Sequence, residues 1–266
     1  MNKMNITVGC DPEVLVQGLM GEMRSIIGLI GGTKMEPKPI PELGEGFAVQ
    51  EDNVAMEFNV PPASDAKTFS DNIGKTLDFL GATVKGKYGL NLCRVSAVSF
   101  PPMELMDPRA QEFGCTPDFN AWTGKTNPRP EAEDKNLRSC GGHVHVGYDV
   151  QKVDPEKAIR FMDLYLGVPS VLMDDGALRK QLYGKAGAFR YTSFGMEYRT
   201  LSNFWIFEDA LRSWVFRNTE KAVNAAVVQP EFRDEDGRAI VDAINSNDKH
   251  LAEMLINKFN LEVAYA

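Results

Sequence analysis

Several short apolar segments of this chain carry acidic, histidine or arginine side chains at every second position. These polar residues are Asp11 and Glu13, Glu57, His143 and His145, and Glu197 and Arg199. Successive side chains of a β-strand point to opposite faces, so residues of equal parity share a face. In each segment valine, methionine, phenylalanine or tyrosine side chains hold the other parity. We therefore expect a sheet with one apolar face and one face that gathers carboxylates, imidazoles and a guanidinium.

Carboxylates gathered on one face repel each other unless a cation neutralises them. Glu51 is a fifth candidate, although Asp52 and Asn53 indicate a turn or bulge between it and Glu57. Oxygen-rich ligand sets with an imidazole suit Mg²⁺ or Mn²⁺ better than Zn²⁺. A carboxylate site that holds several metals beside an arginine is typical of enzymes that bind nucleotide phosphates.

The elements that must position these residues do not alternate regularly between strand and helix. The patterns predict strands at 5–16, 47–60, 90–100, 138–148 and 194–204, and helices at 64–83, 154–182 and 206–262. Pro169 is expected to kink or split the second helix. The long irregular segment 101–137 is expected to be functional or to cover the active site. This order favours an α+β fold with a largely antiparallel, curved sheet of about six strands and helices on its outer face. We expect a single domain, residues 1–266, whose C-terminal part, 206–266, is helical.

The composition argues against some classes of partner. A net charge of −8 disfavours a nucleic-acid-binding surface, which needs clustered lysine and arginine. No apolar run reaches the roughly 18 residues that span a membrane, and the first residues lack the apolar stretch of a signal peptide. The four cysteines have no CxxC spacing and are expected to be buried thiols. We therefore expect a cytoplasmic protein, with its oligomeric state open.

Five segments carry a resemblance to a known family. They are DPE (11–13), QEDNVAMEFN (50–59), GCTPDFNAW (114–122), GGHVHVGY (141–148) and GMEYRTLSNFW (195–205). Together they resemble the phage-type COOH–NH₂ ligases, or amidoligases, of the glutamine synthetase and glutamate–cysteine ligase superfamily. The resemblance covers roughly residues 5–210 in the same order. It implies a glutamine-synthetase-like catalytic fold.

The resemblance also implies a set of site residues. The implied metal ligands, for two or three Mg²⁺ or Mn²⁺ ions around ATP, are Asp11, Glu13, Glu51, Glu57, His143 and Glu197. His145 could replace His143, because both point to one face, and Asp11 has a shorter reach than the glutamate usual in glutamine synthetase. The implied catalytic residues are Arg199, Glu57 and Glu197. The candidate ATP or phosphate contacts are Arg199, Arg190, Lys185 and His145, and weaker candidates for the substrate pocket are Lys34, Asp118, Asn120 and Trp122.

The activity that the resemblance implies is ATP-dependent ligation of a carboxylate to an amine through an acyl phosphate. The substrates would be small molecules or peptides, and a phage-encoded protein would act in the host cytoplasm. One alternative is a guanido-kinase-like phosphoryl transferase on the same scaffold. Another is a non-enzymatic phage structural protein, in which the HVH strands of several chains bind one iron.

Overall fold

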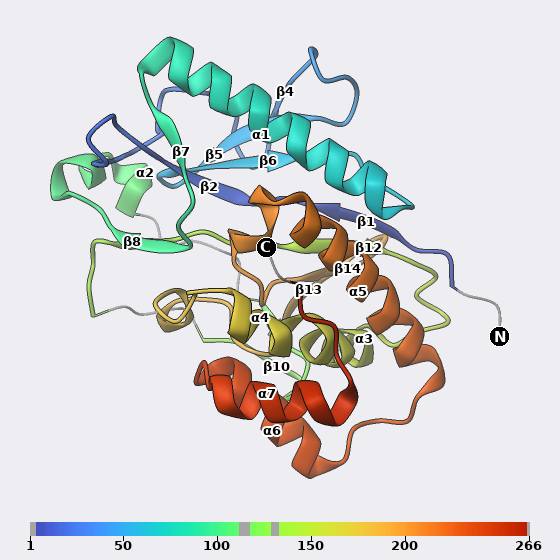
Figure 1. Cartoon of the computed structure of the whole chain (residues 1–266). Coiled ribbons are helices and arrows are strands. Elements are labelled where there is room, and N and C mark those ends of the chain that lie inside the picture. Colours follow the sequence, from blue (N-terminus) through green and yellow to red (C-terminus); the bar gives the residue numbers. More distant parts are fainter. Residues whose placement is uncertain (1–3, 112–117, 129–132, 265–266) are drawn as a thin grey trace.

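The first of two curved antiparallel sheets carries the histidines. The computed structural model describes residues 4–111, 118–128 and 133–264. The strand order of this sheet is β1-β12-β14-β13-β9-β10 (Figure 1). Its strands are β1 (Thr7–Cys10), β12 (Val144–Gly147), β14 (Gly195–Tyr198), β13 (Ala188–Thr192), β9 (Phe119–Asn120) and β10 (Lys125–Thr126). The fold is α+β, as predicted, and the likeness to glutamine synthetase stays a prediction.

The chain passes from the first sheet to a second one between β1 and the next strand, and only Asp11 and Pro12 lie between the two strands. It has the order β3-β2-β6-β5-β4, with β7 paired to β2. Its strands are β2 (Glu13–Gln17), β3 (Met23–Arg24), β4 (Lys38–Pro39), β5 (Ala48–Asp52), β6 (Ala55–Asn59) and β7 (Asn91–Cys93). We expected a single sheet of about six strands, and this prediction is wrong, because the polar strands are divided between two six-stranded sheets. Pro12 has no amide hydrogen to continue the ladder with β12, and its carbonyl instead accepts the amide of Phe58 in β6.

A third, two-stranded sheet pairs β8 (Ala97–Ser99) with β11 (Leu137–Ser139). The predicted irregular segment between them contains two short helices, η1 (Pro102–Leu105) and α2 (Pro108–Gln111). Cys10, Cys93 and Cys140 are buried free thiols, as expected. Cys115 lies outside the described residues.

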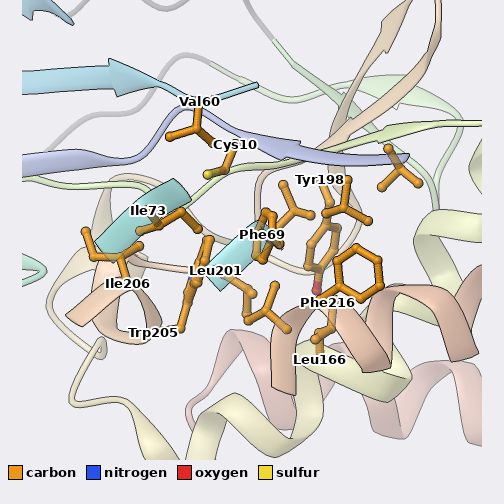
Figure 2. Packing of buried hydrophobic residues seen from close by; sticks show 14 of the residues in the cluster. Cys10, Val60, Phe69, Ile73, Leu166, Tyr198, Leu201, Trp205, Ile206 and Phe216 are labelled. Atoms are coloured by element: carbon orange, nitrogen blue, oxygen red, sulfur yellow. The ribbon is translucent and has the colours of Figure 1, made fainter. Parts of the chain in front are cut away.

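One hydrophobic core joins both large sheets to the helices that cover them. Helix α1 (Ala66–Tyr88) begins at Asp65, whose side chain accepts the Thr68 amide at 2.9 Å, and it packs on α5 (Asp209–Val228). Between these helices the Phe69 ring stacks on Trp205 and meets Phe216, each at a centroid distance of 5.8 Å (Figure 2). Trp205 belongs to η4 (Asn203–Phe207), the short helix that follows β14. This packing fixes the apolar faces of the strands, so their polar faces must point the other way.

The predicted helix 154–182 is made of several parts. Helix α3 (Pro155–Met162) runs through the π-helical turn η2 (Asp163–Gly167) into α4 (Val168–Met173). Helical structure therefore continues through Pro169, and the chain is widened at η2 rather than split. The short helix η3 (Arg179–Gln181) follows. The π turn buries Asp163 beneath β14, and such turns occur often at functional sites.

The C-terminal part is helical, as predicted. Helix α5 is followed by α6 (Asp234–Asn245) and α7 (Lys249–Phe259). Among the helices of the described ranges, none is long and apolar enough to cross a membrane.

Candidate functional site

Strand register places the predicted polar residues of the first sheet on one face. Gly9 in β1 lies opposite His145 in β12, which lies opposite Glu197 in β14, which lies opposite Arg190 in β13. Directly paired residues of adjacent strands point to the same side. The expectation that His145 and Glu197 share a face is therefore confirmed, and Arg190, which was expected only as a phosphate contact, lies on the same face. Their apolar neighbours Val144, Val146 and Met196 are buried in the core.

Asp11, His145 and Glu197 form a first group whose candidate ligand atoms all lie within 4.8 Å of one another. His145 Nε2 lies 3.1 Å from Asp11 Oδ1. The two atoms are not aligned as a hydrogen bond, and each is buried without a hydrogen-bond partner in the described structure. Burial opposes the charged form of Asp11, yet the charge of His145 and the contact with His143 hold its pKa well below its usual range. Asp11 is therefore an anion, and its unused lone pair is available to a cation.

His143 lies at the edge of this group. Its Nδ1 is 3.4 Å from Asp11 Oδ1, 3.5 Å from Glu197 Oε1 and 3.3 Å from a terminal nitrogen of Arg199. Burial and the Arg199 charge lower the pKa of His143. For His145 burial acts in the same direction, but the charge of Asp11, the contact with its carboxylate and the charge of Glu197 together outweigh it and raise the pKa. The set of candidate ligand atoms within 4.8 Å of one another contains His145 and not His143. The geometry therefore favours His145, which was the alternative, as the histidine that binds a metal.

Glu13, Asp52 and Glu57 form a second group on the other sheet, again with ligand atoms within 4.8 Å. Glu57 in β6 lies opposite both Glu13 in β2 and Gln50 in β5. Burial first, and then the charge of Asp52, raise the pKa of Glu13 to about 7. Burial, together with the charges of Asp11 and Glu13, raises the pKa of Glu57 well above its usual range. These shifts show that the described groups do not neutralise the acids of this cluster.

Asp52, rather than Glu51, completes the second group. Chain reversal at Asn53 and Val54 pairs Asp52 with Ala55 and Glu51 with Met56, so Asp52 shares the face of Glu57. Glu51 points to the opposite face. Its carboxylate accepts the amides of Gly28 and Gly31, each at 2.9 Å, and lies 3.2 Å from Arg109. The structure therefore does not bring Glu51 into either group. The positive φ of Asn53 marks the turn that sets this register.

Two arginines stand beside the first group. Arg199 is only 4 % exposed, pairs with Glu197, and places its Nε 3.4 Å from Asp118. Arg190 lies 3.8 Å from the other oxygen of Glu197. Burial raises the pKa of Glu197, but the charges of Arg199, His143 and His145 together outweigh it and lower the pKa. Glu197 is therefore ionised and held between two guanidinium groups.

The remaining predicted residues divide between the site and its scaffold. Lys34 lines a cavity of about 330 Å³ together with Glu13, Asp52, His143 and Arg199. Asn120 instead accepts the amides of Trp122 and Thr123 within its own turn. Among the described residues that line the cavity, neither Asn120 nor Trp122 is present. For Lys185, the structure shows a backbone role, in which its carbonyl accepts the Thr200 hydroxyl at 3.1 Å.

Sequence reasoning missed Asp163, which lies beneath Arg199. Its carboxylate accepts hydrogen bonds from Trp122 Nε1 and the Gly187 amide, each at 2.6 Å, from the Tyr198 hydroxyl at 2.8 Å and from the Thr200 hydroxyl at 3.2 Å. Burial raises its pKa to about 6 despite these donors. Tyr198 and Thr200 flank Arg199 in sequence, so Asp163 fixes the backbone that carries this arginine. The only signal in the sequence was an acid on the apolar side of a helix.

Comparison with known protein families gives a match over part of the chain. Residues 134–252 match the model of a family described as Phage phiEco32-like COOH.NH2 ligase-type 2. No curated protein matches the sequence. The matched segment contains both histidines, Glu197 and the two arginines beside it. It overlaps, over residues 134–210, the part of the chain for which the motifs indicated the same family. This match supports the assignment of the chain to the COOH–NH₂ ligase, or amidoligase, family.

Proposed function

We propose that this protein is an ATP-dependent carboxylate–amine ligase that uses Mg²⁺ or Mn²⁺. The family match supports a ligase that joins a carboxylate and an amine. The observation that carries the finer proposal is the pair of acidic groups on either side of the bend at Asp11 and Pro12, each with three candidate ligands. A carboxylate is a poor electrophile, so it must be activated, here by phosphorylation from ATP, before an amine can attack it. Phosphate charge in turn needs cations beside it.

The residues present fit a divalent metal. Asp11 Oδ1 and His145 Nε2 are buried, lack hydrogen-bond partners in the described structure and face the same point. Five carboxylates and one imidazole make up the two groups, a donor set that suits Mg²⁺ or Mn²⁺. When bound, such ions supply positive charge that screens the phosphates of ATP. The first group would hold one ion through Asp11, His145 and Glu197, and the second would hold another through Glu13, Asp52 and Glu57.

In the proposed reaction, an oxygen of the substrate carboxylate attacks the γ-phosphorus of ATP and ADP leaves. The amine then attacks the acyl carbon, phosphate leaves, and the nitrogen gives up a proton to form the amide. Arg199 is placed to stabilise charge on the phosphoryl group, because its planar fork of donors is held in position by Glu197 and by the backbone above Asp163. Arg190, on the other side of Glu197, is the second candidate for a phosphate contact.

A product assay tests this proposal and separates it from phosphoryl transfer. The protein is incubated with Mg–ATP and a pool of amino acids and polyamines, and the products are identified by mass spectrometry. We expect ADP, inorganic phosphate and a product whose mass equals two pool members less one water. The reaction should need Mg²⁺ or Mn²⁺ and survive selective chelation of zinc. A stable phosphorylated pool member without an amide product would instead establish a phosphoryl transferase.

A further inference from the structure

The cavity beside the second acidic group has a basic wall, of which the proposed mechanism uses only Arg199. The acids Glu13 and Asp52 lie on one side of it. Its cationic residues are Lys34, Arg109, Arg138, Arg179 and Arg199. Three of these arginines are 4 % exposed or less, namely Arg138, Arg179 and Arg199. Burying a guanidinium is costly unless an anion or a full set of acceptors compensates it.

Most of these arginines are compensated by the protein itself. Arg109 pairs with Asp107 at 2.9 Å and with Glu51 at 3.2 Å. Arg199 pairs with Glu197 and Asp118. Arg138 donates to three backbone carbonyls at 2.7–2.9 Å and to the side chain of Asn53 at 3.2 Å. Arg109 and Arg138 therefore have their charge or donors satisfied before any ligand enters, and Arg199 already has two carboxylate partners.

Arg179 differs from these neighbours. It is 2 % exposed, and its guanidinium donates to the carbonyls of Thr200 at 3.0 Å and Arg199 at 3.4 Å. Its Nε has no hydrogen-bond partner, and no carboxylate of the described ranges lies within ion-pairing distance of it. Glu13 is the acid whose charge acts on it most strongly. Gly184, at a φ of +78°, makes room for it, since a Cβ there would lie 2.0 Å from its terminal nitrogen.

From this arrangement we propose that Arg179 binds the carboxylate of the substrate to be ligated, in the cavity beside Glu13 and across from Arg199. Glu13 and Asp174 act on Arg179 only from beyond ion-pairing distance. A substrate carboxylate would supply a direct partner, and its two oxygens match the donor fork of a guanidinium. Arg199 and Arg190 stand at Glu197, on the side where the phosphates are proposed. Arg179 would therefore bind the substrate carboxylate, whereas Arg199 and Arg190 would contact the phosphates of ATP. This inference rests on the proposed function.

Nuclear magnetic resonance of the arginine Nε–H groups tests the inference directly, with acetate as the probe. The Arg179 signal is assigned by its loss in Arg179→Lys or, should that variant not fold, through bonds to its backbone in the parent. We expect sodium acetate to shift this signal saturably, while sodium chloride at equal ionic strength does not. The Arg138 signal serves as the internal control, because its donors are already bonded.

The outcomes separate the two proposals. An Arg179 signal that acetate leaves unmoved overturns the inference, and so does a signal that moves only with Mg–ATP, since Arg179 would then contact phosphate. An acetate shift equal to that of Arg138 also overturns it, because such a shift is not site-specific. Failure of the ligation assay would leave the acetate titration intact and would count against the proposed function alone.

Discussion

Replacing Glu13 by glutamine is expected to abolish metal-dependent turnover and, at pH 8, to raise the melting temperature of the metal-free protein. Glu13 belongs to the second acidic group, so the substitution removes one ligand and one negative charge. Its amide oxygen still accepts the Gly141 amide, which Glu13 Oε2 accepts at 2.7 Å. A loss of about 10²-fold or more in rate is expected from removing such electrostatic support.

The gain in stability follows from the direction of the pKa shift. A folded-state pKa of about 7, raised above the ordinary value of 4.5, means that ionised Glu13 destabilises the fold. The parent therefore loses stability relative to the variant as pH rises from about 4.5 through 7, by on the order of 1–3 kcal/mol. Melting curves of both proteins in chelator should coincide near pH 4 and separate by a few degrees at pH 8.

Glu51→Gln is the matched control for this experiment. Glu51 lies on the neighbouring strand, but its carboxylate is bonded to the Gly28 and Gly31 amides and faces Arg109. Removing its charge should lower the stability, by on the order of 1 kcal/mol, because the exposed amides of Gly28 and Gly31 lose a charged acceptor. Opposite signs for the two variants are expected. A Glu13→Gln protein that melts well below its parent at pH 8 would show that Glu13 is a structural residue.

Arg199→Lys is expected to fold and to bind Mg–ATP within about tenfold of the parent, yet to lose about 10²-fold or more in turnover. Lysine keeps the charge that pairs with Glu197 and Asp118. It lacks the planar fork that contacts several phosphoryl oxygens together. The measurements are the melting temperature, the Kd for Mg–ATP and kcat. A near-parental kcat would remove Arg199 from the mechanism and leave it with a structural ion pair.

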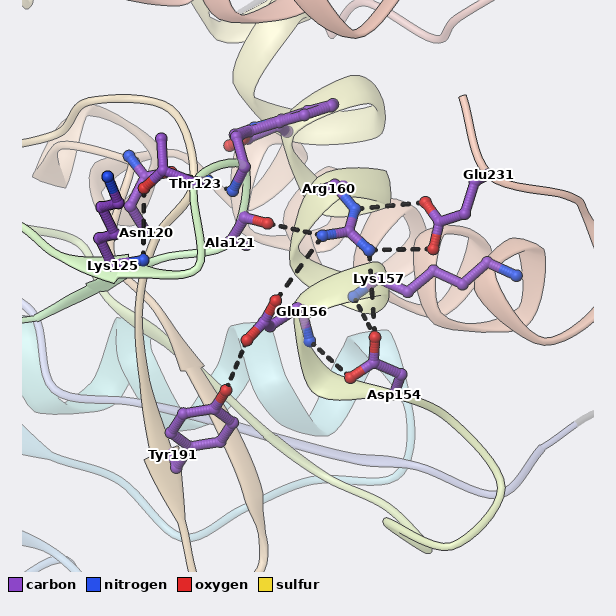
Figure 3. Close-up of polar contacts among 12 residues, drawn as sticks. Asn120, Ala121, Thr123, Lys125, Asp154, Glu156, Lys157, Arg160, Tyr191 and Glu231 are labelled. Atoms are coloured by element: carbon purple, nitrogen blue, oxygen red, sulfur yellow. Dashed lines mark hydrogen bonds and ion pairs between the residues drawn. The ribbon is translucent and has the colours of Figure 1, made fainter. Parts of the chain in front are cut away.

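Arg160→Lys provides the control for replacing a bidentate arginine outside the site. Arg160 in α3 donates to both oxygens of Glu231 and to the Ala121 carbonyl (Figure 3). Its lysine variant should lose some stability, for the same loss of the fork. Its turnover per folded molecule should match that of the parent. If only Arg199→Lys loses turnover, the loss comes from the guanidinium at the site and not from replacing any bidentate arginine by lysine.

The face on which the polar residues gather could be predicted because strand parity is a local property. His145 and Glu197 needed only the alternation of their own strands and an antiparallel pairing. The helical C-terminal part was equally local, since each helix carries its own apolar stripe. These features depend on neighbours only a few residues away.

Other features depended on contacts that the sequence does not reveal. Whether Glu51 or Asp52 joins Glu57 was decided by the register of a turn at Asn53, and a shift of one residue reverses the faces. The division into two sheets depends on a long-range pairing. Before Pro12 the chain pairs with β12, and after Pro12 it pairs with β6, which the local sequence does not indicate. Asp163 and Arg179 act through partners near residues 187–200, so their roles appear only when the chain is folded.

The most direct test of the central claim is the melting temperature of the parent protein with Mg–ATP, compared with ATP in excess chelator. A ligand at about 100 times its Kd stabilises a protein by about 2.7 kcal/mol. For a chain of this size that corresponds to a rise of about 5–10 °C. We predict this rise with Mg–ATP or Mn–ATP, and little or none with chelated ATP or with Glu57→Gln. An unchanged melting temperature in saturating Mg–ATP would contradict the assignment of the two acidic groups to metal-bound nucleotide.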